Sequence, residues 1–392
     1  MMTTQQLHNE AGAELNRLLA FWSGLRDERG GFYGGVDYQL NIQPDAVKSG
    51  ILNNRILWLF SNAFLLRGDR QALINARHAY EFLRDRFVDA QHGGVYWMLG
   101  ADGTPADEMK HSYNHAFAVY GLSSYFDASR DGQALQLAKE LYRIIEERFA
   151  DEYGYREAFA RTWTPAGNDA LSEDGYNAAK TMNTLLHLIE AYTELYRVSL
   201  DAEVGSSLRK ALRLCLDKVY DRDGRMLYVF FDERMNSIAD IYSYGHDIEA
   251  TWLLDRACEI LGDTQLAGEV AAMNREIAAH VRKEAFAGGA LCNQRLRGEV
   301  DETRVWWVQA EGIVGFLNAY QRTGDKVYLD TVFALWEYIK EYMIDKRPGG
   351  EWYWSVDTTG KPAAGKPIVE PWKCPYHNGR MCMEVIKRCA KL

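Results

Sequence analysis

Apolar residues recur at helical spacing along the chain, and short turns that combine glycine with aromatic residues interrupt them at a nearly constant period. The turns read GGFYG, GGVYW, YGYRE, DGRMLY, GGALC and GGEWYW, with glycines at Gly30, Gly93, Gly154, Gly224, Gly288 and Gly349, about 60 to 70 residues apart. A motif that returns at such a period predicts stacked copies of one supersecondary unit. The pattern therefore indicates six repeats.

Each repeat contains two helical patterns that differ in the distribution of their apolar residues. The first, as in DKVYLDTVFALWEYIKEYM over 325–343, is apolar on one face, whereas the second, as in GILNNRILWLFSNAFLL over 50–66, is apolar nearly all round. A one-faced helix covers a core, and an apolar helix is buried within it. We expect outer helices to start near Ala11, Arg70, Asp131, Asp201, Thr264 and Asp325, and inner helices near Gly50, His111, Lys180, Tyr242, Arg304 and Pro371.

Twelve helices in six hairpins predict an all-α fold. If the hairpins close on themselves, they form an (α/α)6 barrel in which short β-hairpin-like turns precede the inner helices at the active-site end. No proline- or serine-rich linker divides the chain. We therefore expect a single catalytic domain over residues 1–392.

Polar and aromatic residues gather at the first turns of the inner helices. In chain order these residues are Arg55; His111, Tyr113 and His115; Asn183 and His187; His246 and Glu249; Trp306, Trp307 and Glu311; and Trp372, His377 and Arg380. In a closed barrel these starts point to one end of the axis, so we expect them to converge on one funnel. Five of the nine histidines lie there, which favours a site over five separate packing roles. We expect His8, His78, His92 and His280 to be surface or packing residues.

Composition narrows the possible classes of protein. The formal charge is −10 with lysine and arginine dispersed, which argues against a nucleic-acid or anionic-membrane surface. The start lacks a signal-peptide pattern and no apolar run approaches the length of a membrane span, so we expect a cytoplasmic protein with no membrane partner. Six cysteines show no paired framework and fit buried, reduced thiols. Eleven tryptophans and 23 tyrosines suit stacking on sugar rings, although packing explains any single one equally well.

Spacing alone suggests some local chemistry. His246 and Glu249 are three residues apart on one helix face, so the carboxylate can orient the imidazole for proton transfer; a buried hydrogen bond is the simpler alternative. Arg55 can stabilise an oxyanion or form a salt bridge. Cys374 and His377 form a C-x-x-H pair without the further ligands that zinc requires, so we predict no metal site and expect Cys374 to be a buried thiol.

Five strings carry a family resemblance: NNRILWLFSNAF, KTMNTLLHLIEAYTELYR, YGHDIEATWLL, RVWWVQAEG and WKCPYHNGRMCMEV. Together they resemble the N-acylglucosamine 2-epimerase superfamily, and most closely its cellobiose 2-epimerase branch. The resemblance extends from about Gly30 to Arg388 and implies an (α/α)6 barrel. It also implies an isomerase that interconverts the gluco and manno configurations at C2 of a free reducing-end sugar, such as cellobiose or lactose, without a cofactor.

The resemblance implies roles for individual residues. His246 and His377 would remove and return the C2 proton on opposite faces, His187 would assist ring opening, Glu249 would support His246, and Arg55 would lie near the C1 and C2 oxygens. Tyr113, Asn183, Trp307 and Trp372 would contact the substrate, and we expect Glu311, on the fifth inner helix, to do so as well. The family often has an acidic residue before the third inner helix, where this chain has Gly175 with Asp174 beside it. That contact is therefore not assigned.

Other functions remain open from the sequence. Monosaccharide 2-epimerases and aldose–ketose isomerases share the two-histidine arrangement. An inverting glycoside hydrolase on a similar barrel would use a carboxylate pair from among Asp247, Glu249 and Glu311. A non-enzymatic sugar-binding or scaffold protein is the third class. In every case the expected partner is a small-molecule sugar, and for the enzyme we expect a monomer or weak homodimer.

Overall fold

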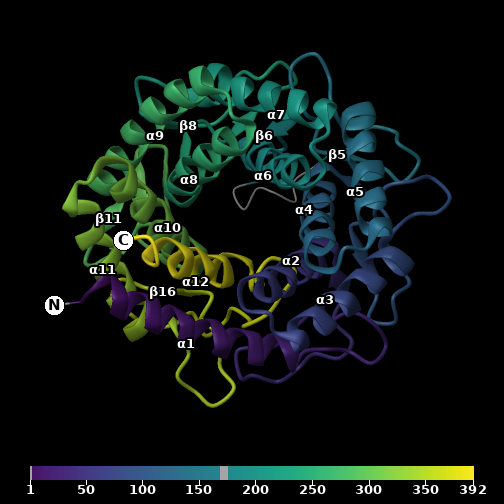
Figure 1. The fold of residues 1–392 in the computed structure, drawn as a ribbon, viewed down its shortest axis with the longest axis horizontal. Coiled ribbons are helices and arrows are strands. Elements are labelled where there is room, and N and C mark those ends of the chain that lie inside the picture. Colours follow the sequence, from purple (N-terminus) through teal and green to yellow (C-terminus); the bar gives the residue numbers. More distant parts are fainter. Residues whose placement is uncertain (1, 168–174) are drawn as a thin grey trace.

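The computed structural model describes residues 2–167 and 175–392, so Asp174 lies outside the described residues. The described residues contain twelve α-helices in two concentric rings (Figure 1). The inner ring consists of α2 (Gly50–Arg67), α4 (Ser112–Ser129), α6 (Met182–Ser199), α8 (Tyr244–Leu261), α10 (Trp306–Thr323) and α12 (Tyr376–Cys389). The outer ring consists of α1 (Thr4–Ser23), α3 (Arg70–Phe82), α5 (Gly132–Ile144), α7 (Ala202–Leu214), α9 (Thr264–Ala285) and α11 (Lys326–Tyr338).

The inner ring is closed. Each inner helix contacts the next one along the chain, and α12 contacts α2. Inner helices are buried on all sides, as α2 is from Gly50 to Ser61, whereas the outer helix α7 buries a single stripe that includes Val204, Leu208 and Ala211. The predicted (α/α)6 barrel and its assignment of inner and outer helices are confirmed. No helix in the described part of the chain is both long and apolar enough to cross a bilayer.

Most helix starts agree with the sequence, because aspartate caps mark them. Asp69, Asp131, Asp201 and Asp325 each accept a hydrogen bond from a backbone N–H in the first turn of the outer helix that follows. Two starts differ from the prediction. Helix α1 begins at Thr4, not near Ala11, because Thr3 and Gln6 form a capping box. Helix α12 begins at Tyr376, because irregular backbone follows Pro371.

The outer helices also repeat in how they end. A π-helical turn follows α3, α5, α7 and α11. These turns are Leu83–Phe87, Ile145–Phe149, Cys215–Val219 and Ile339–Met343. The common ending supports equivalent repeats.

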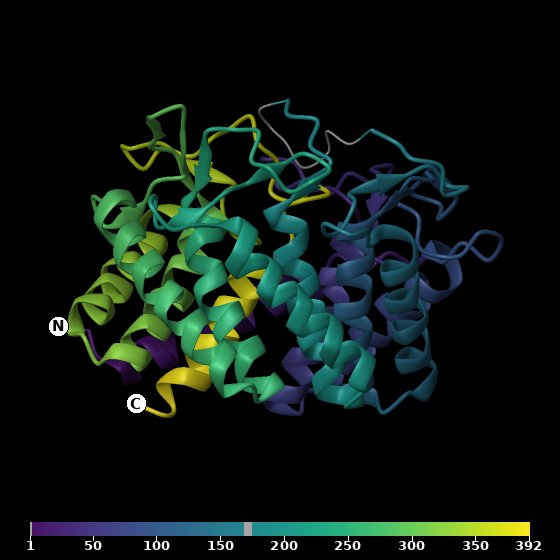
Figure 2. The same cartoon turned by 90° about the horizontal axis from the view of Figure 1, so that it is seen from above.

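Short strands gather at the end of the barrel where the inner helices begin (Figure 2). The strands that lead into inner helices are β1 (Lys48–Ser49), β4 (Lys110–His111), β6 (Lys180–Thr181), β10 (Ile241–Ser243) and β15 (Arg304–Val305). Their antiparallel partners come from the next repeat: β2 (Met98–Leu99), β5 (Ala158–Phe159), β9 (Phe230–Phe231), β13 (Gln294–Leu296) and β16 (Ser355–Val356). A bridge between Val36 and Val369 joins the first repeat to the sixth.

The expected hairpin-like turns are therefore present, but most of the pairing connects neighbouring repeats. Within single repeats, β3 (Pro105–Asp107) extends β2 and β14 (Glu299–Asp301) extends β13. Two further hairpins pair β7 (Tyr220–Asp221) with β8 (Met226–Leu227), and β11 (Phe286–Ala287) with β12 (Ala290–Leu291).

Buried ion pairs fix several of these strands to the turn before them. The ammonium of Lys48 lies 2.7 Å from an Asp27 oxygen, and that of Lys110 lies 2.9 Å from Asp89. Lys180 repeats the contact with an Asp151 oxygen at 2.8 Å. Because breaking a buried pair leaves an uncompensated charge, these contacts hold the starts of the inner helices firmly.

Candidate active site

A cavity of about 390 Å³ opens at the end of the barrel where the inner helices begin. All six inner helices or the residues just before them supply its wall, including Arg55, Tyr113, Asn183, His187, Ser243, His246, Trp306, Trp307, Trp372 and His377. The six helix starts converge on one cavity, as predicted, but five of the residues named for it do not line the cavity: His111, His115, Glu249, Glu311 and Arg380. Such a cavity, with few convergent polar groups and aromatic walls, is the usual form of a small-molecule site.

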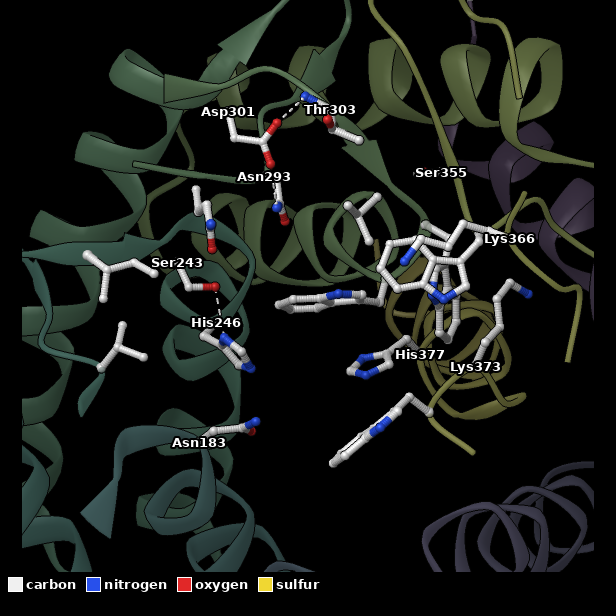
Figure 3. Close-up of a pocket in the computed structure, with 18 of the residues that line it drawn as sticks. Asn183, Ser243, His246, Asn293, Asp301, Thr303, Ser355, Lys366, Lys373 and His377 are labelled. Atoms are coloured by element: carbon white, nitrogen blue, oxygen red, sulfur yellow. Dashed lines mark hydrogen bonds between the residues drawn. The ribbon is translucent and has the colours of Figure 1, made fainter. Parts of the chain in front are cut away.

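His246 and His377 face each other across this cavity (Figure 3). His246 comes from the first turn of α8, and His377 from the first turn of α12 on the opposite wall. The indole of Trp307 contacts both rings, with centroids 4.6 Å from His246 and 5.4 Å from His377. The two imidazoles therefore share one aromatic neighbour, Trp307, and both line the same cavity.

His377 has a carboxylate partner. Its Nδ1 lies 2.7 Å from Oε1 of Glu311 on the neighbouring α10. Burial, reinforced by the charges of Arg55 and Arg380, keeps the pKa of His377 well below its usual value, so the ring is neutral at neutral pH. A neutral ring that donates Nδ1–H to Glu311 presents the lone pair of Nε2 to the cavity.

His246 has a different partner from the one predicted. Its Nδ1 lies 2.8 Å from Oγ of Ser243, and burial lowers its pKa to about 3. The predicted pairing of His246 with Glu249 is wrong. Glu249 lies one turn deeper on α8, faces the barrel axis and accepts a hydrogen bond from Arg380. The spacing of three residues correctly predicted that His246 and Glu249 lie on one helix. It did not predict their hydrogen-bond partners, which are Ser243 and Arg380.

Arg380 organises a buried charge cluster below the cavity. Its guanidinium lies 2.5 Å from Glu190 and 2.7 Å from Glu311, and also bonds to Glu249. Burial and the charge of Glu311 raise the pKa of Glu249 to about 8, and burial also raises the pKa of Glu311. Burial would raise the pKa of Glu190 as well, but Arg380 and His187 lower it to about 2.

The cluster also corrects the expected role of Glu311. Glu311 and Glu249 are fully buried and do not form part of the cavity wall, so Glu311 is not placed as a substrate contact. Glu249, Glu311 and His377 offer ligand atoms within 4.8 Å of one another, the geometry of a potential metal site. Arg380 already supplies the cation for both carboxylates.

His187 has a carboxylate that the sequence interpretation missed. Its Nδ1 lies 3.0 Å from Oε2 of Glu190 on the same helix. Burial lowers the pKa of His187 despite this contact. The signal was available, because the spacing between His187 and Glu190 equals the spacing that drew attention to His246 and Glu249. A search for every His-x-x-Glu would have found it.

Arg55 lies at the floor of the cavity. It donates to the hydroxyl of Tyr113 at 2.8 Å, and its guanidinium carbon lies 4.2 Å from the centroid of Phe117. The salt bridge considered as an alternative is not found among the described residues; a backbone carbonyl and Cys374 complete its polar contacts. Nε of Arg55 and Oδ1 of Asn183 are buried without a hydrogen-bond partner in the described structure. Both residues line the cavity, and each of these atoms leaves hydrogen-bonding capacity unused there.

Two of the five inner-helix histidines are structural. His111 lies at the N-cap of α4, where Nδ1 accepts from Tyr113 N at 3.2 Å and the ring packs on Trp97. His115 accepts from the backbone N–H of Val95 at 3.1 Å. Neither residue belongs to the cavity wall. Cys374 is buried, as expected.

The outer part of the cavity was not predicted. Asn293, Asp301, Thr303, Trp354, Ser355 and Lys366 line it. They come from strands and loops before α10 and α12, where no helical repeat marks a functional position. Asp301 accepts from the Asn293 amide at 2.8 Å and from the Thr303 N–H at 2.9 Å, which fixes this rim (Figure 3).

Residues 31–378 match the N-acylglucosamine 2-epimerase family. The chain belongs to this family. It is 54% identical over 374 residues to a cellobiose 2-epimerase of Ruminococcus albus, covering 95% of the chain and 96% of the relative. A cellobiose 2-epimerase of Dictyoglomus turgidum is 46% identical over the same coverage. A crystal structure of a sugar epimerase from a ruminal bacterium superposes with a TM-score of 0.96 at 53% identity, covering 97% of the chain and 98% of that structure.

Membership of the N-acylglucosamine 2-epimerase family, at this identity, makes the chain an enzyme of the isomerase class, a sugar 2-epimerase. The resemblance read from the sequence is confirmed. The glycoside-hydrolase and scaffold alternatives are set aside in favour of this activity.

Proposed function

We propose that the protein is a cofactor-independent 2-epimerase of the reducing-end glucose unit of a disaccharide such as cellobiose or lactose, with the manno epimer as product. The observation that carries the proposal is the opposed pair of neutral histidines, His246 and His377, in one cavity. The names of the most similar relatives support the disaccharide, and the polar rim around Asp301 offers room and hydrogen bonds beyond the floor.

The first step is ring opening, because the C2 proton becomes acidic only beside a free aldehyde. His187, held by Glu190 and packed against the ring of Tyr113, is the group proposed to move the proton between the ring oxygen and O1. A neutral imidazole can accept one proton and return another without a large change in pKa.

Epimerisation then requires removal of the C2 proton from one face and delivery to the other. Nε2 of one histidine takes the proton as the C2–H bond breaks, and the electron pair forms a cis-enediolate. The opposite histidine, which has taken up a proton from solvent at Nε2, gives that proton to C2 on the other face, and the first histidine releases the proton it took from C2 to solvent. The result is inversion at C2.

The enediolate carries negative charge on O1 and O2. Arg55 is the proposed partner, because its cation lies at the cavity floor with an unpaired Nε and without a carboxylate partner in the described residues. A preorganised cation in a buried site stabilises developing charge without reorganising in the transition state. Trp307 and Trp372 are proposed as aromatic surfaces for the sugar, and Tyr113 and Asn183 as hydrogen-bonding contacts.

Incubation with cellobiose in D2O tests the proposal. We expect a C2 epimer that carries deuterium at C2, measured by NMR and mass spectrometry. His246→Asn and His377→Asn should each abolish inversion while the circular dichroism spectrum is retained. Inversion without deuterium incorporation would exclude the enediolate mechanism.

A substrate panel separates the disaccharide from the monosaccharide alternative. Cellobiose, lactose, glucose and mannose should be compared by kcat/KM, with ketose formation measured in the same samples. A preference for the disaccharides supports the proposal. A preference for mannose, or ketose as the main product, would assign the protein to a monosaccharide epimerase or an aldose–ketose isomerase.

A further inference from the structure

Ser243 occupies the N-cap of α8, but its hydroxyl does not cap that helix. Serine is favoured at this position because its oxygen accepts a backbone N–H of the first turn. Ser49 and Thr181 do so at the N-caps of α2 and α6, where they accept from Leu52 N at 3.0 Å and from Thr184 N at 3.1 Å. The oxygen of Ser243 instead lies 2.8 Å from Nδ1 of His246. Ser243 therefore makes a hydrogen bond with His246 in the cavity wall and none with the backbone of the first turn of its own helix.

The backbone of Ser243 is held in place. It lies on β10, which pairs with β13, and β13 pairs in turn with β14, so the residue belongs to a three-stranded sheet. Its direct partner across the strands is Gln294. Ser243 lines the cavity and is 8% exposed. The hydroxyl is thus presented to His246 from a rigid element.

Ser243 is placed to set the orientation of the His246 ring. The indole of Trp307 packs against the ring of His246, and the hydroxyl of Ser243 forms a hydrogen bond with its Nδ1. His377 differs, because its Nδ1 contacts the carboxylate of Glu311. The hydrogen bond at Nδ1 fixes which way the ring of His246 points, and when the hydroxyl is the acceptor it leaves Nε2 unprotonated.

Taking the two-histidine reaction proposed above as given, we propose that Ser243 is the positioning residue of His246: its Oγ accepts Nδ1–H and holds the unprotonated Nε2 toward C2 of the sugar. When Nε2 takes the C2 proton, Nδ1–H remains hydrogen-bonded to Oγ of Ser243. The hydroxyl therefore also orients the imidazolium that returns a proton to C2. Loss of this hydroxyl weakens proton transfer on the His246 face and leaves the His377 face intact.

Deuterium exchange measured separately from each epimer tests this assignment. Each of cellobiose and its C2 epimer is incubated in D2O, and deuterium at C2 is measured in the remaining starting sugar and in the product. In His246→Asn, the epimer whose C2–H faces His377 should exchange and return without inverting. His377→Asn should give the mirror result with the other epimer. These two variants identify which epimer belongs to which histidine.

Ser243→Ala should follow the pattern of His246→Asn. For the epimer that faces His377, the ratio of exchange to inversion should rise about tenfold or more, because reprotonation on the opposite face is impaired. For the other epimer, exchange and inversion should fall together. Ser243→Thr, which keeps the hydroxyl, should restore the ratio. Ser243→Cys keeps the side-chain size with a weaker hydrogen bond and should raise the ratio even if the alanine variant folds poorly.

Ser49→Ala is the matched control, since it removes a hydroxyl that does cap an inner helix. It should lower the melting temperature more than Ser243→Ala does and leave the ratio of exchange to inversion unchanged. An unchanged ratio in Ser243→Ala, or an equal rise for both epimers, would refute the role of Ser243. Absence of C2 exchange in the unmodified protein would instead refute the two-histidine reaction itself, and the role of Ser243 with it.

Discussion

Nδ1 of His377 lies 2.7 Å from Oε1 of Glu311, and the two residues stand on neighbouring helices of the closing half of the ring. The opposite histidine has a hydroxyl at the equivalent nitrogen. The two sides of the cavity therefore differ in the group behind the imidazole, a carboxylate at His377 and a hydroxyl at His246, although both rings are neutral. A carboxylate stabilises an imidazolium more than a hydroxyl does, so Glu311 favours protonation of His377, while burial and the charges of Arg55 and Arg380 oppose it.

Replacing Glu311 with glutamine tests this relationship. The amide keeps the size of the side chain but removes the charge that supports protonated His377. We expect kcat to fall by about 10²-fold or more, within the range that a positioned acid–base group contributes. KM should change little, because Glu311 does not line the cavity. Steady-state kinetics with cellobiose would measure both constants.

Glu249→Gln is the matched control for this experiment. Oε1 of Glu249 lies 3.9 Å from Nδ1 of His377, beyond hydrogen-bond distance, so the amide removes no hydrogen bond from this histidine. The loss of kcat should be much smaller than for Glu311→Gln. Equal losses in the two variants would contradict the distinction between the two carboxyls.

Gly245→Ala is expected to displace Trp307. A methyl group on Gly245 would lie 2.5 Å from two atoms of the Trp307 ring and 2.8 Å from Val308 Cγ2, closer than packed atoms allow. Because Trp307 contacts both histidines, we expect kcat/KM to fall by about 10²-fold, the scale of a misplacement near 1 Å. Gly268→Ala meets no atom within 4 Å and should retain full activity with a slightly higher melting temperature.

Arg380→Met should destabilise the fold. It removes the only cation that the described structure places between Glu190, Glu249 and Glu311. We expect the free energy of unfolding at pH 7 to fall by about 3–5 kcal/mol, as when one partner of a buried ion pair is lost. Urea denaturation would measure it.

The pH dependence gives Arg380→Met a second readout. Without the arginine, the pKa of Glu190 is no longer held low and burial raises it, so the folded variant takes up a proton at this carboxyl as the pH falls that the unmodified protein does not. The difference in stability from the unmodified protein should therefore narrow between pH 7 and pH 5. A constant difference would mean that the arginine does not compensate the carboxylates.

His115→Gln should preserve activity and reduce acid sensitivity. Burial lowers the pKa of His115 from 6.5 to about 3. Between these values the unfolded chain binds a proton that the folded chain does not, so stability falls as the pH falls, by up to about 1.4 kcal/mol per pH unit. Glutamine removes that loss. Gln309 shows that it fits, since its Oε1 accepts from Leu291 N at 2.8 Å in the equivalent place on α10.

Urea denaturation at pH 7 and pH 5 would measure the change. The variant should lose less stability than the unmodified protein over this interval and keep its kcat at pH 7. A large loss of kcat would contradict this prediction, because His115 does not line the cavity and should not affect the reaction.

Much of the fold was predictable because it depends on local, repeated signals. The glycine turns and the contrast between one-faced and apolar helices recur six times in the sequence, and aspartate caps such as Asp69 and Asp325 mark five of the outer helices. The pairing of strands between repeats was not predictable. Segments such as β4 and β5 are two residues long and carry no alternation from which a partner can be inferred.

The sequence predicted where in the barrel the candidate site lies, but it did not predict most of the hydrogen bonds between its residues. Helix spacing located His246 and His377, but the partner of each depends on which helices become neighbours when the ring closes. Glu311 is 66 residues from His377 in the chain, and Glu190 is 190 residues from Arg380. Local spacing does hold for His187 and Glu190, where both residues face the barrel axis.

The two chain ends lie on the side of the ring away from the strands and the cavity mouth (Figure 2). A tag, a surface anchor or a fused enzyme joined at either end would therefore leave the path of the sugar clear. The same geometry suits immobilised catalysis, in which the mouth faces the flowing solution while the opposite side is held to the support.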